Sequence, residues 1–296
     1  MVRRRGPGTV AFTVCNYVTL TAFALVCILP ILHALMASFS DPATLSRTDG
    51  LVLWPLGRPT LDGYRYVLNN RSIGIGYLNT LIYVAAGTSL GVLMTYVAGY
   101  VLSRRNLGLK RFLSLMMLFT MWFNGGLIPT YMVVKELGLI DTRLALILPT
   151  AMSVYHFIIM RTSLAEIPAS LEESAKIDGA GHFTIMFRII MPLCKATVAV
   201  ISLYYAVNIW NAWFYATIYL PHASHLRPLQ VVLREILIES DISSMSVPSD
   251  AASSTDLYKQ LVQYSTIIVA TVPILAVYPF VQKYFVTGVM IGSIKG

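Results

Sequence analysis

The sequence predicts an all-α protein that crosses a membrane several times. Of its 296 residues, 56% are hydrophobic and only 12% are charged, whereas soluble domains carry about 25% charged residues. A helix needs about 20 largely apolar residues to cross the hydrocarbon core of a bilayer. Six runs meet this requirement and are predicted as transmembrane helices: 12–36, 77–102, 113–134, 144–162, 193–220 and 262–287.

The basic residues give these helices an orientation. Arg3, Arg4 and Arg5 precede the first run, and basic residues concentrate on the cytoplasmic side of membrane proteins. With both termini cytoplasmic, the shorter inner segments hold more than half of the 22 Lys and Arg residues. The predicted domains are an N-terminal tail over 1–11, a membrane domain over 12–287 with outer loops at 37–76 and 221–261, and a C-terminal tail over 288–296. The net charge of +8 is then a topology signal and not a nucleic-acid footprint.

The six runs lack the groups that ion-driven transport requires. They contain no Asp or Glu, and His33 and His156, both near run ends, are the obvious titratable side chains. Carriers driven by protons or sodium usually keep ionisable groups at membrane depth, so an ion-coupled secondary carrier is a disfavoured alternative. The chain also has no G-x-x-x-x-G-K-[ST] phosphate loop. If it takes part in active transport, another polypeptide must supply the energy.

Catalytic and metal-binding patterns are missing as well. No nucleophile stands with a base and an orienting group, so a membrane-embedded enzyme acting on glycan or lipid is the second disfavoured alternative. Cys15, Cys27 and Cys194 show no metal-ligand spacing and are expected to be small buried apolar residues. His222 and His225 have no further ligands nearby. We therefore expect a non-catalytic chain with no metal and no cofactor of its own.

The third run is interrupted at 122–131, WFNGGLIPTY. Gly125, Gly126 and Pro129 leave backbone groups unpaired, which membranes tolerate only against protein or a water-filled cavity. Residues 124–129 therefore line a pathway or form its outer gate. The alternative interpretation is a kink that helps packing, or simply the end of a helix. On the first interpretation, Asn124, Gly125 and Tyr131 are pathway candidates.

The fifth run is rich in aromatic and amide side chains. Tyr205, Asn208, Asn211 and Trp213 suit a sugar, whose rings stack on aromatic faces while its hydroxyls hydrogen-bond. Asn208 and Asn211 are three residues apart and share a helix face. The alternative is the aromatic belt that Trp and Tyr form at any membrane interface.

The cytoplasmic loop at 163–192 holds two predicted short helices, at 170–178 and 182–190. Ser170 and Glu173 fit a capping box, and Gly179 fits a C-terminal stop because glycine enters the left-handed conformation freely. A helix this short is marginal in water, so it must pack on something. One possibility is the chain's own membrane domain, and the other is a partner protein.

The spacing in this loop resembles the EAA loop of bacterial ABC importer permeases. Glu173-Ser174-Ala175, three residues, Gly179, nine residues, Ile189, one residue and Met191-Pro192 is similar to the family pattern E-A-A, three, G, nine, I, one, L-P. The sequence departs from it at Ser174 and Met191. In that family the loop docks into a cleft of an ATPase subunit. The resemblance implies ATPase-coupling roles for Glu172, Glu173, Ser174, Ala175, Asp178 and Gly179, with Glu173 reaching a basic residue, Ser174 and Ala175 packing in the cleft, and Asp178 and Gly179 shaping the turn.

The resemblance extends over most of the chain, including the C-terminal Gly288 and Gly292–Gly296. It implies the type I importer permease fold, specifically the smaller permease of the sugar-importing branch. Residues 122–131 resemble a sub-branch that imports acidic or complex oligosaccharides, such as aldouronate- and alginate-type chains. The implied partners are a second homologous permease, two ATPases that bind ATP and Mg, and an extracytoplasmic binding protein. The implied location is the bacterial inner membrane.

Overall fold

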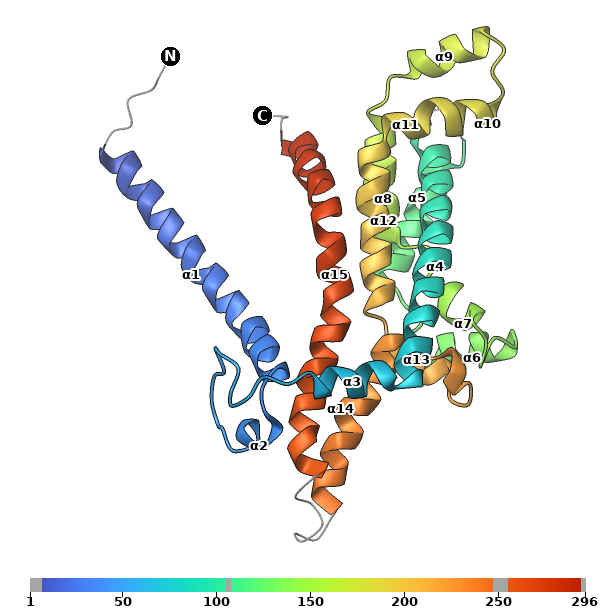
Figure 1. The fold of residues 1–296 in the computed structure, drawn as a ribbon. Helices are drawn as coiled ribbons and strands as arrows, with labels where there is room; N and C mark the ends of the chain where they lie inside the picture. Colours follow the sequence, from blue (N-terminus) through green and yellow to red (C-terminus); the bar gives the residue numbers. More distant parts are fainter. Residues whose placement is uncertain (1–6, 105–107, 247–254, 294–296) are drawn as a thin grey trace. The chain divides into compact units, whose positions relative to one another are not determined.

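The computed structural model describes residues 7–104, 108–246 and 255–293, and within these ranges every regular element is helical (Figure 1). Two helices are long and apolar enough to cross a membrane alone: α1 (Pro7–Ser38) and α4 (Arg71–Ser103). Two bent pairs pass the same test only when each pair counts as one span. The described residues thus hold two to four candidate spans, and the six predicted helices are confirmed only in part.

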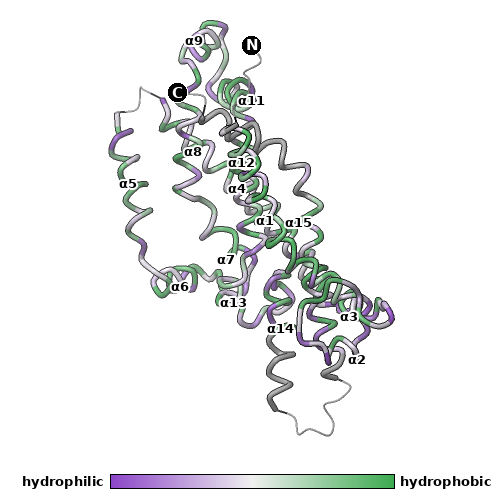
Figure 2. Tube along the Cα trace, turned by 90° about the vertical axis from the view of Figure 1, so that its left-hand side faces the viewer, coloured by the Kyte–Doolittle hydropathy of each residue, from purple (hydrophilic) through white to green (hydrophobic). Residues whose placement is uncertain are grey.

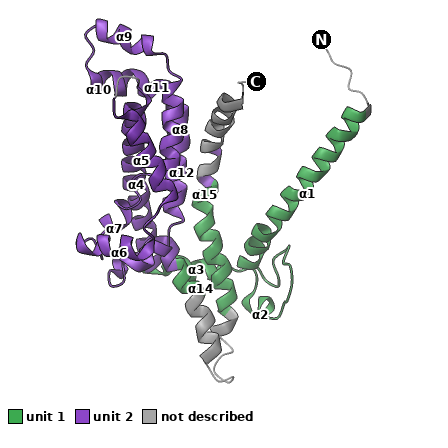
Figure 3. Ribbon diagram, turned by 180° about the vertical axis from the view of Figure 1, so that it is seen from behind, with its two compact units in different colours: residues 1–71, 233–275 green, residues 72–232, 276–296 purple. Residues whose placement is uncertain are grey.

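The described chain divides into two compact units (Figure 3). The first unit consists of residues 1–71 and 233–275, and the second of residues 72–232 and 276–296. Both α14 (Leu229–Ser246) and α15 (Thr255–Ser293) have residues in each unit, and α4 begins at the boundary with Arg71.

The first unit contains α1, whose residues are mostly apolar along its length (Figure 2), a composition typical of a helix surrounded by lipid. The predicted outer loop 37–76 contains two short helices, α2 (Pro42–Leu45) and α3 (Asp62–Asn69), before α4 begins. Ala37, Leu45, Val52 and Leu261 form the core of this unit. His33 belongs to the same packing, because its Nδ1 accepts the Val52 N–H at 2.9 Å and its Nε2 lies 3.1 Å from the Tyr264 hydroxyl.

Helix α4 packs through glycines in the second unit. A Cβ added at Gly91 would lie 2.9 Å from the Tyr205 ring, and one added at Gly99 would lie 2.9 Å from Met160. Small residues let membrane helices approach closely and gain dispersion contacts. Gly91 therefore fits α4 against α12 (Lys195–Trp210), and Gly99 fits it against α8 (Val154–Ala165).

Three predicted spans are shorter or more broken than expected. The third consists of α5 (Lys110–Trp122) and α6 (Leu127–Glu136), and the helix axis bends by 113° between them. The fourth is split into α7 (Leu144–Ile147) and α8. Because α8 has 12 residues, it is only about 18 Å long. The fifth ends at Trp210 and resumes as α13 (Phe214–Tyr219).

The cytoplasmic loop and the two later segments differ from the prediction mainly at their ends. The loop contains α9 (Ala169–Ile177), α10 (His182–Thr184), a π-helical turn η1 (Ile185–Ile190) and α11 (Met191–Leu193). Residues 182–193 and α12 form one of the two bent pairs, and the helix axis bends by 85° between them. Helix α15 continues through 288–293, part of the predicted C-terminal tail. The Ser-rich stretch 243–254 is predicted as a flexible loop, but residues 243–246 belong to α14. Residues 247–254 and 294–296 lie outside the described residues.

Candidate functional site

The candidate coupling segment, residues 169–193, lies beyond one end of α4 and α8 (Figure 1). Helix α9 begins directly after Pro168, whose φ of −58° and ψ of 134° give it an extended conformation. The capping-box prediction is wrong, because this start places Ser170 inside the first turn and no side chain caps the helix. The proline ring fixes the backbone at the helix entry instead.

The predicted stop at Gly179 is confirmed. Gly179 has a φ of +83°. The Gly179 N–H donates to the Lys176 carbonyl at 3.0 Å, and the Ala180 N–H donates to the Ala175 carbonyl at 2.9 Å. These two bonds form a Schellman motif, which satisfies carbonyls left free at a helix end.

The two faces of α9 have different surroundings. Glu172 and Ala175, three residues apart, are buried within this chain, whereas Glu173 and Ser174 are exposed. The coupling roles of Glu172 and Ala175 stay predictions, but both side chains pack within this chain. Ala175 lies in a core with other residues of the second unit, whereas Glu173 and Ser174 beside it face outward.

Two exposed apolar residues border the turn and were missed by the sequence analysis. Ile177 is 86% exposed and Phe183 is 77% exposed. Asp178 and Gly179 lie between them and are exposed too. The signal was present in the sequence, since isolated large apolar side chains in a polar loop suggest a contact surface. We call Glu173, Ser174, Ile177 and Phe183 the outer face.

The inner side of the segment contacts the C-terminal end of α4 and Arg104, the residue directly after the helix. Arg104 Nε lies 3.0 Å from Glu172 Oε1, although the N–H is not aligned for a hydrogen bond. The Arg104 guanidinium carbon lies 4.8 Å from the centre of the Tyr100 ring. The Tyr96 hydroxyl donates to the Met186 carbonyl in η1. The loop helix thus packs on its own membrane domain, the first of the two possibilities open from sequence, while its outer face stays exposed.

The break in the third run borders a cavity of about 250 Å³. The Asn124 Oδ1 accepts the Gly126 N–H at 2.7 Å, and Gly126 has a φ of +87°. The residues that line the cavity come from this break and from two later segments: Asn124, Gly126, Leu127, Thr130, Ala145, Leu146, Pro149, Thr150, Tyr215 and Tyr219. Asn124 is thus placed at a partly polar hollow. Gly125 is exposed but does not line it, and Tyr131 stacks on Tyr219 with ring centres 6.3 Å apart.

The candidates of the fifth run fall into two groups. Tyr205 is 3% exposed, and its hydroxyl lies 2.7 Å from Thr95 Oγ1 and accepts the Ser153 N–H at 2.9 Å. Its role in the pathway stays a prediction, and within this chain both its ring and its hydroxyl are engaged in packing. Asn208, Asn211 and Trp213 are exposed.

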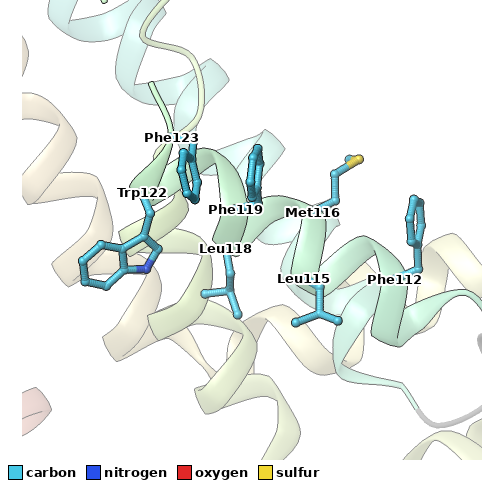
Figure 4. A pocket seen from close by; sticks show the side chains of 7 residues that line it. All are labelled: Phe112, Leu115, Met116, Leu118, Phe119, Trp122 and Phe123. Atoms are coloured by element: carbon cyan, nitrogen blue, oxygen red, sulfur yellow. The ribbon is translucent and has the colours of Figure 1, made fainter. Parts of the chain in front are cut away.

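A larger hollow of about 510 Å³ lies along α5 and is unsuited to sugar (Figure 4). Its lining consists of Phe112, Leu115, Met116, Leu118, Phe119, Trp122 and Phe123. Apart from the Trp122 indole N–H, these side chains offer no N–H or O–H group, so sugar hydroxyls would be left unpaired. The surface suits lipid or another apolar helix.

Comparison with known proteins defines the class of this one. The model of the family described as "Binding-protein-dependent transport system inner membrane component" matches residues 111–291, more than half of the chain. The chain belongs to this family. It is the permease component of a bacterial sugar importer of the ABC type and not an enzyme. Family membership therefore argues against an ion-coupled secondary carrier and against a membrane-embedded enzyme acting on glycan or lipid.

Two relatives and one solved structure show which kinds of importer permease this chain resembles. The chain is 40% identical to the polygalacturonan/rhamnogalacturonan transport system permease protein YtcP of Bacillus subtilis (strain 168), over 96% of this chain and 98% of that protein. It is 39% identical to protein LplC of the same organism, over 96% and 95%. Among solved structures, it matches a chain of a bacterial ABC transporter involved in the import of the acidic polysaccharide alginate. That match has a TM-score of 0.85 and 29% identity, and covers 96% of this chain and all of the other. The fold is therefore that of a type I ABC importer permease.

Proposed function

We propose that the chain forms half of the translocation pathway of an ATP-driven importer and couples to an ATPase through the outer face. The observation that carries the proposal is the exposure of Glu173, Ser174, Ile177 and Phe183 on a segment whose other side is fixed to α4. An exposed surface that joins apolar and acidic groups suits a partner with a cleft and a basic residue.

In this proposal Glu173 pairs with a basic residue of the ATPase, and Ile177 and Phe183 fill apolar parts of its cleft. Asp178 and Gly179 set the turn between them. Two ATPase subunits bind ATP and Mg, so this chain holds no cofactor. Closure of the two ATPase subunits pushes α9 and tilts the membrane helices, so that the translocation pathway opens to the outside of the membrane. A second homologous permease and an extracytoplasmic binding protein complete the complex.

The proposed substrate is an acidic oligo- or polysaccharide. Two comparisons support this class: the 40% identical relative is named for polygalacturonan and rhamnogalacturonan transport, and the matching solved structure concerns alginate import. We propose that Asn208, Asn211 and Trp213 contact the sugar, and that Asn124, with Gly125 and Tyr131 near it, forms part of the pathway or its outer gate. Uptake of labelled oligogalacturonates, compared with neutral oligosaccharides of equal length, tests the class, and equal uptake of both would refute it.

The proposed topology has six membrane segments with both termini in the cytoplasm. The basic residues before the first run support this orientation. The proposed regions remain the tails at 1–11 and 288–296, the membrane domain at 12–287, the coupling loop at 163–192 and the outer loops at 37–76 and 221–261.

Affinity purification of the tagged chain from its native membranes tests the coupling. We expect the wild type to bring an ATPase subunit and a second permease. Glu173→Arg should lose the ATPase while it keeps the second permease, because the charge reversal repels the basic partner. Glu136→Arg, the same change at an exposed site at the end of α6, serves as the control. An unchanged ATPase yield and normal uptake with Glu173→Arg would refute the proposal.

A further inference from the structure

The C-terminal end of α4 and the residue that follows it contact the coupling segment both before and after its turn. Tyr96 and Tyr100 are four residues apart and share a face of α4, and Arg104 comes directly after the last residue of the helix, Ser103. Arg104 reaches α9 through Glu172, and Tyr96 reaches η1 through the Met186 carbonyl. Tyr100 lies between them, under the guanidinium of Arg104. The segment before the turn and the segment after it are therefore attached to the same end of α4.

The ion pair between Arg104 and Glu172 is shielded from water. The Glu172 side chain is 9% exposed and the Arg104 side chain is 19% exposed. A shielded pair adds little net stability, because removing two charges from water offsets their attraction. Loss of one partner is harmful, because the other charge then stays buried alone. Such a pair therefore fixes the position of α9 more than it stabilises the fold, and the Tyr100 ring holds the guanidinium in place through a cation–π contact.

The second attachment depends on the π-helical turn. In η1 the Met191 N–H bonds to the Met186 carbonyl, five residues back, and the same carbonyl accepts the Tyr96 hydroxyl. Single π turns inside helices are common at functional positions. Tyr96 is fully buried, so the segment after the turn cannot shift without disturbing α4.

We infer that Arg104 and Glu172 are positioning residues that transmit the movement of the coupling segment to α4. The inference rests on the proposed function, since it requires an ATPase that pushes on the outer face. Glu172 and Glu173 then act on different sides of one helix, the first on this chain and the second on the partner. Movement of α4 passes onward because its glycines pack it closely against α8 and α12.

The test measures transport and ATP hydrolysis together in the complete complex, reconstituted in proteoliposomes with its binding protein and an oligogalacturonate. Glu172→Gln keeps the size of the side chain and removes its charge. We expect it to retain the ATPase subunits and to hydrolyse ATP, while the sugar transported per ATP falls about tenfold, within the range typical of coupling between two sites. Glu136→Gln is the control and should leave this ratio unchanged.

The reversed pair, Arg104→Glu with Glu172→Arg, separates transmission from a general structural defect. It should recover much of the ratio lost in either single reversal, because attraction is restored with the charges exchanged. An unchanged ratio in Glu172→Gln, or no recovery in the reversed pair, would overturn the inference. Loss of the ATPase from Glu172→Gln would overturn it too, since the residue would then belong to docking. These outcomes differ from failure of the proposed function, in which Glu173→Arg would retain its ATPase.

Discussion

Replacement of Gly179 by alanine should weaken ATPase binding through the backbone alone. A Cβ added at Gly179 would meet no atom within 4 Å, so steric conflict with neighbours does not contribute. The φ of +83° costs an L-residue about 1–2 kcal/mol. In the free chain the turn can relax and relieve this strain, whereas docking requires the turn to re-form. Since 1.4 kcal/mol corresponds to a tenfold change, the affinity for the ATPase should fall by about 5- to 30-fold.

Gly181→Ala is the matched control, because Gly181 lies in the same turn, has an equally open environment and has an ordinary φ of −71°. Both variants are placed in nanodiscs with the second permease and titrated with fluorescent ATPase subunits to obtain Kd. The reasoning requires weaker binding by Gly179→Ala and unchanged binding by Gly181→Ala. Equal Kd values for the two variants would mean that docking does not depend on the left-handed turn, and the proposed geometry of coupling would fail.

Two paired substitutions test the packing of the second unit by apparent unfolding temperature in detergent. Gly91→Ala should lower this temperature because its Cβ would lie 2.9 Å from a Tyr205 ring that two hydrogen bonds hold in place, and overpacking costs about 1–3 kcal/mol. Gly74→Ala, in an open part of α4, should raise it by the better helix propensity of alanine, and a fall in both variants would refute this account. Tyr205→Phe should lower the temperature because it leaves a backbone N–H unpaired, at about 1–3 kcal/mol. Tyr219→Phe should leave it unchanged or raise it, because the buried Tyr219 hydroxyl has no hydrogen-bond partner among the described residues; equal losses in the two tyrosine variants would contradict the assignment.

The sequence was sufficient for features that depend on local chemistry. Gly179 ends α9 because a left-handed residue is needed there, and the two glycines before Pro129 predict the interruption between α5 and α6. The 113° bend at that interruption could not be predicted, because the length of an apolar run does not indicate the direction that a helix takes after a break. The short α8 was missed for a related reason. The run 144–162 stays apolar through the irregular stretch that separates α7 from α8, and hydropathy does not distinguish helix from other buried backbone.

The buried position of Glu172 could not be predicted because its cause lies far away in the chain. Two adjacent glutamates in a polar loop have the pattern of a solvated face, and nothing local tells them apart. Arg104, directly after the end of α4, provides the counter-charge that lets Glu172 enter the interior. The packing of Tyr205 could not be predicted for the same kind of reason, since an aromatic residue in a membrane helix suits a sugar or a core equally well. Thr95 and Ser153, which hydrogen-bond to its hydroxyl, are distant from it in the chain.

The short length of α9 explains why adjacent residues of one motif have different surroundings. With 3.6 residues per turn, the nine residues of α9 make about two and a half turns, so the side that packs on this chain has room for only two or three residues. Glu172 and Ala175 fall on the side of this chain, and Glu173, Ser174 and Ile177 fall on the exposed side. An acidic group at 172 and a small one at 175 are thus explained by Arg104 and by the core of the second unit, with no need of a partner. The requirement for a partner rests on Glu173, Ile177 and Phe183, which no contact within the described chain explains. Substitutions on the two sides should therefore separate cleanly, with loss of coupling on the inner side and loss of assembly on the outer side.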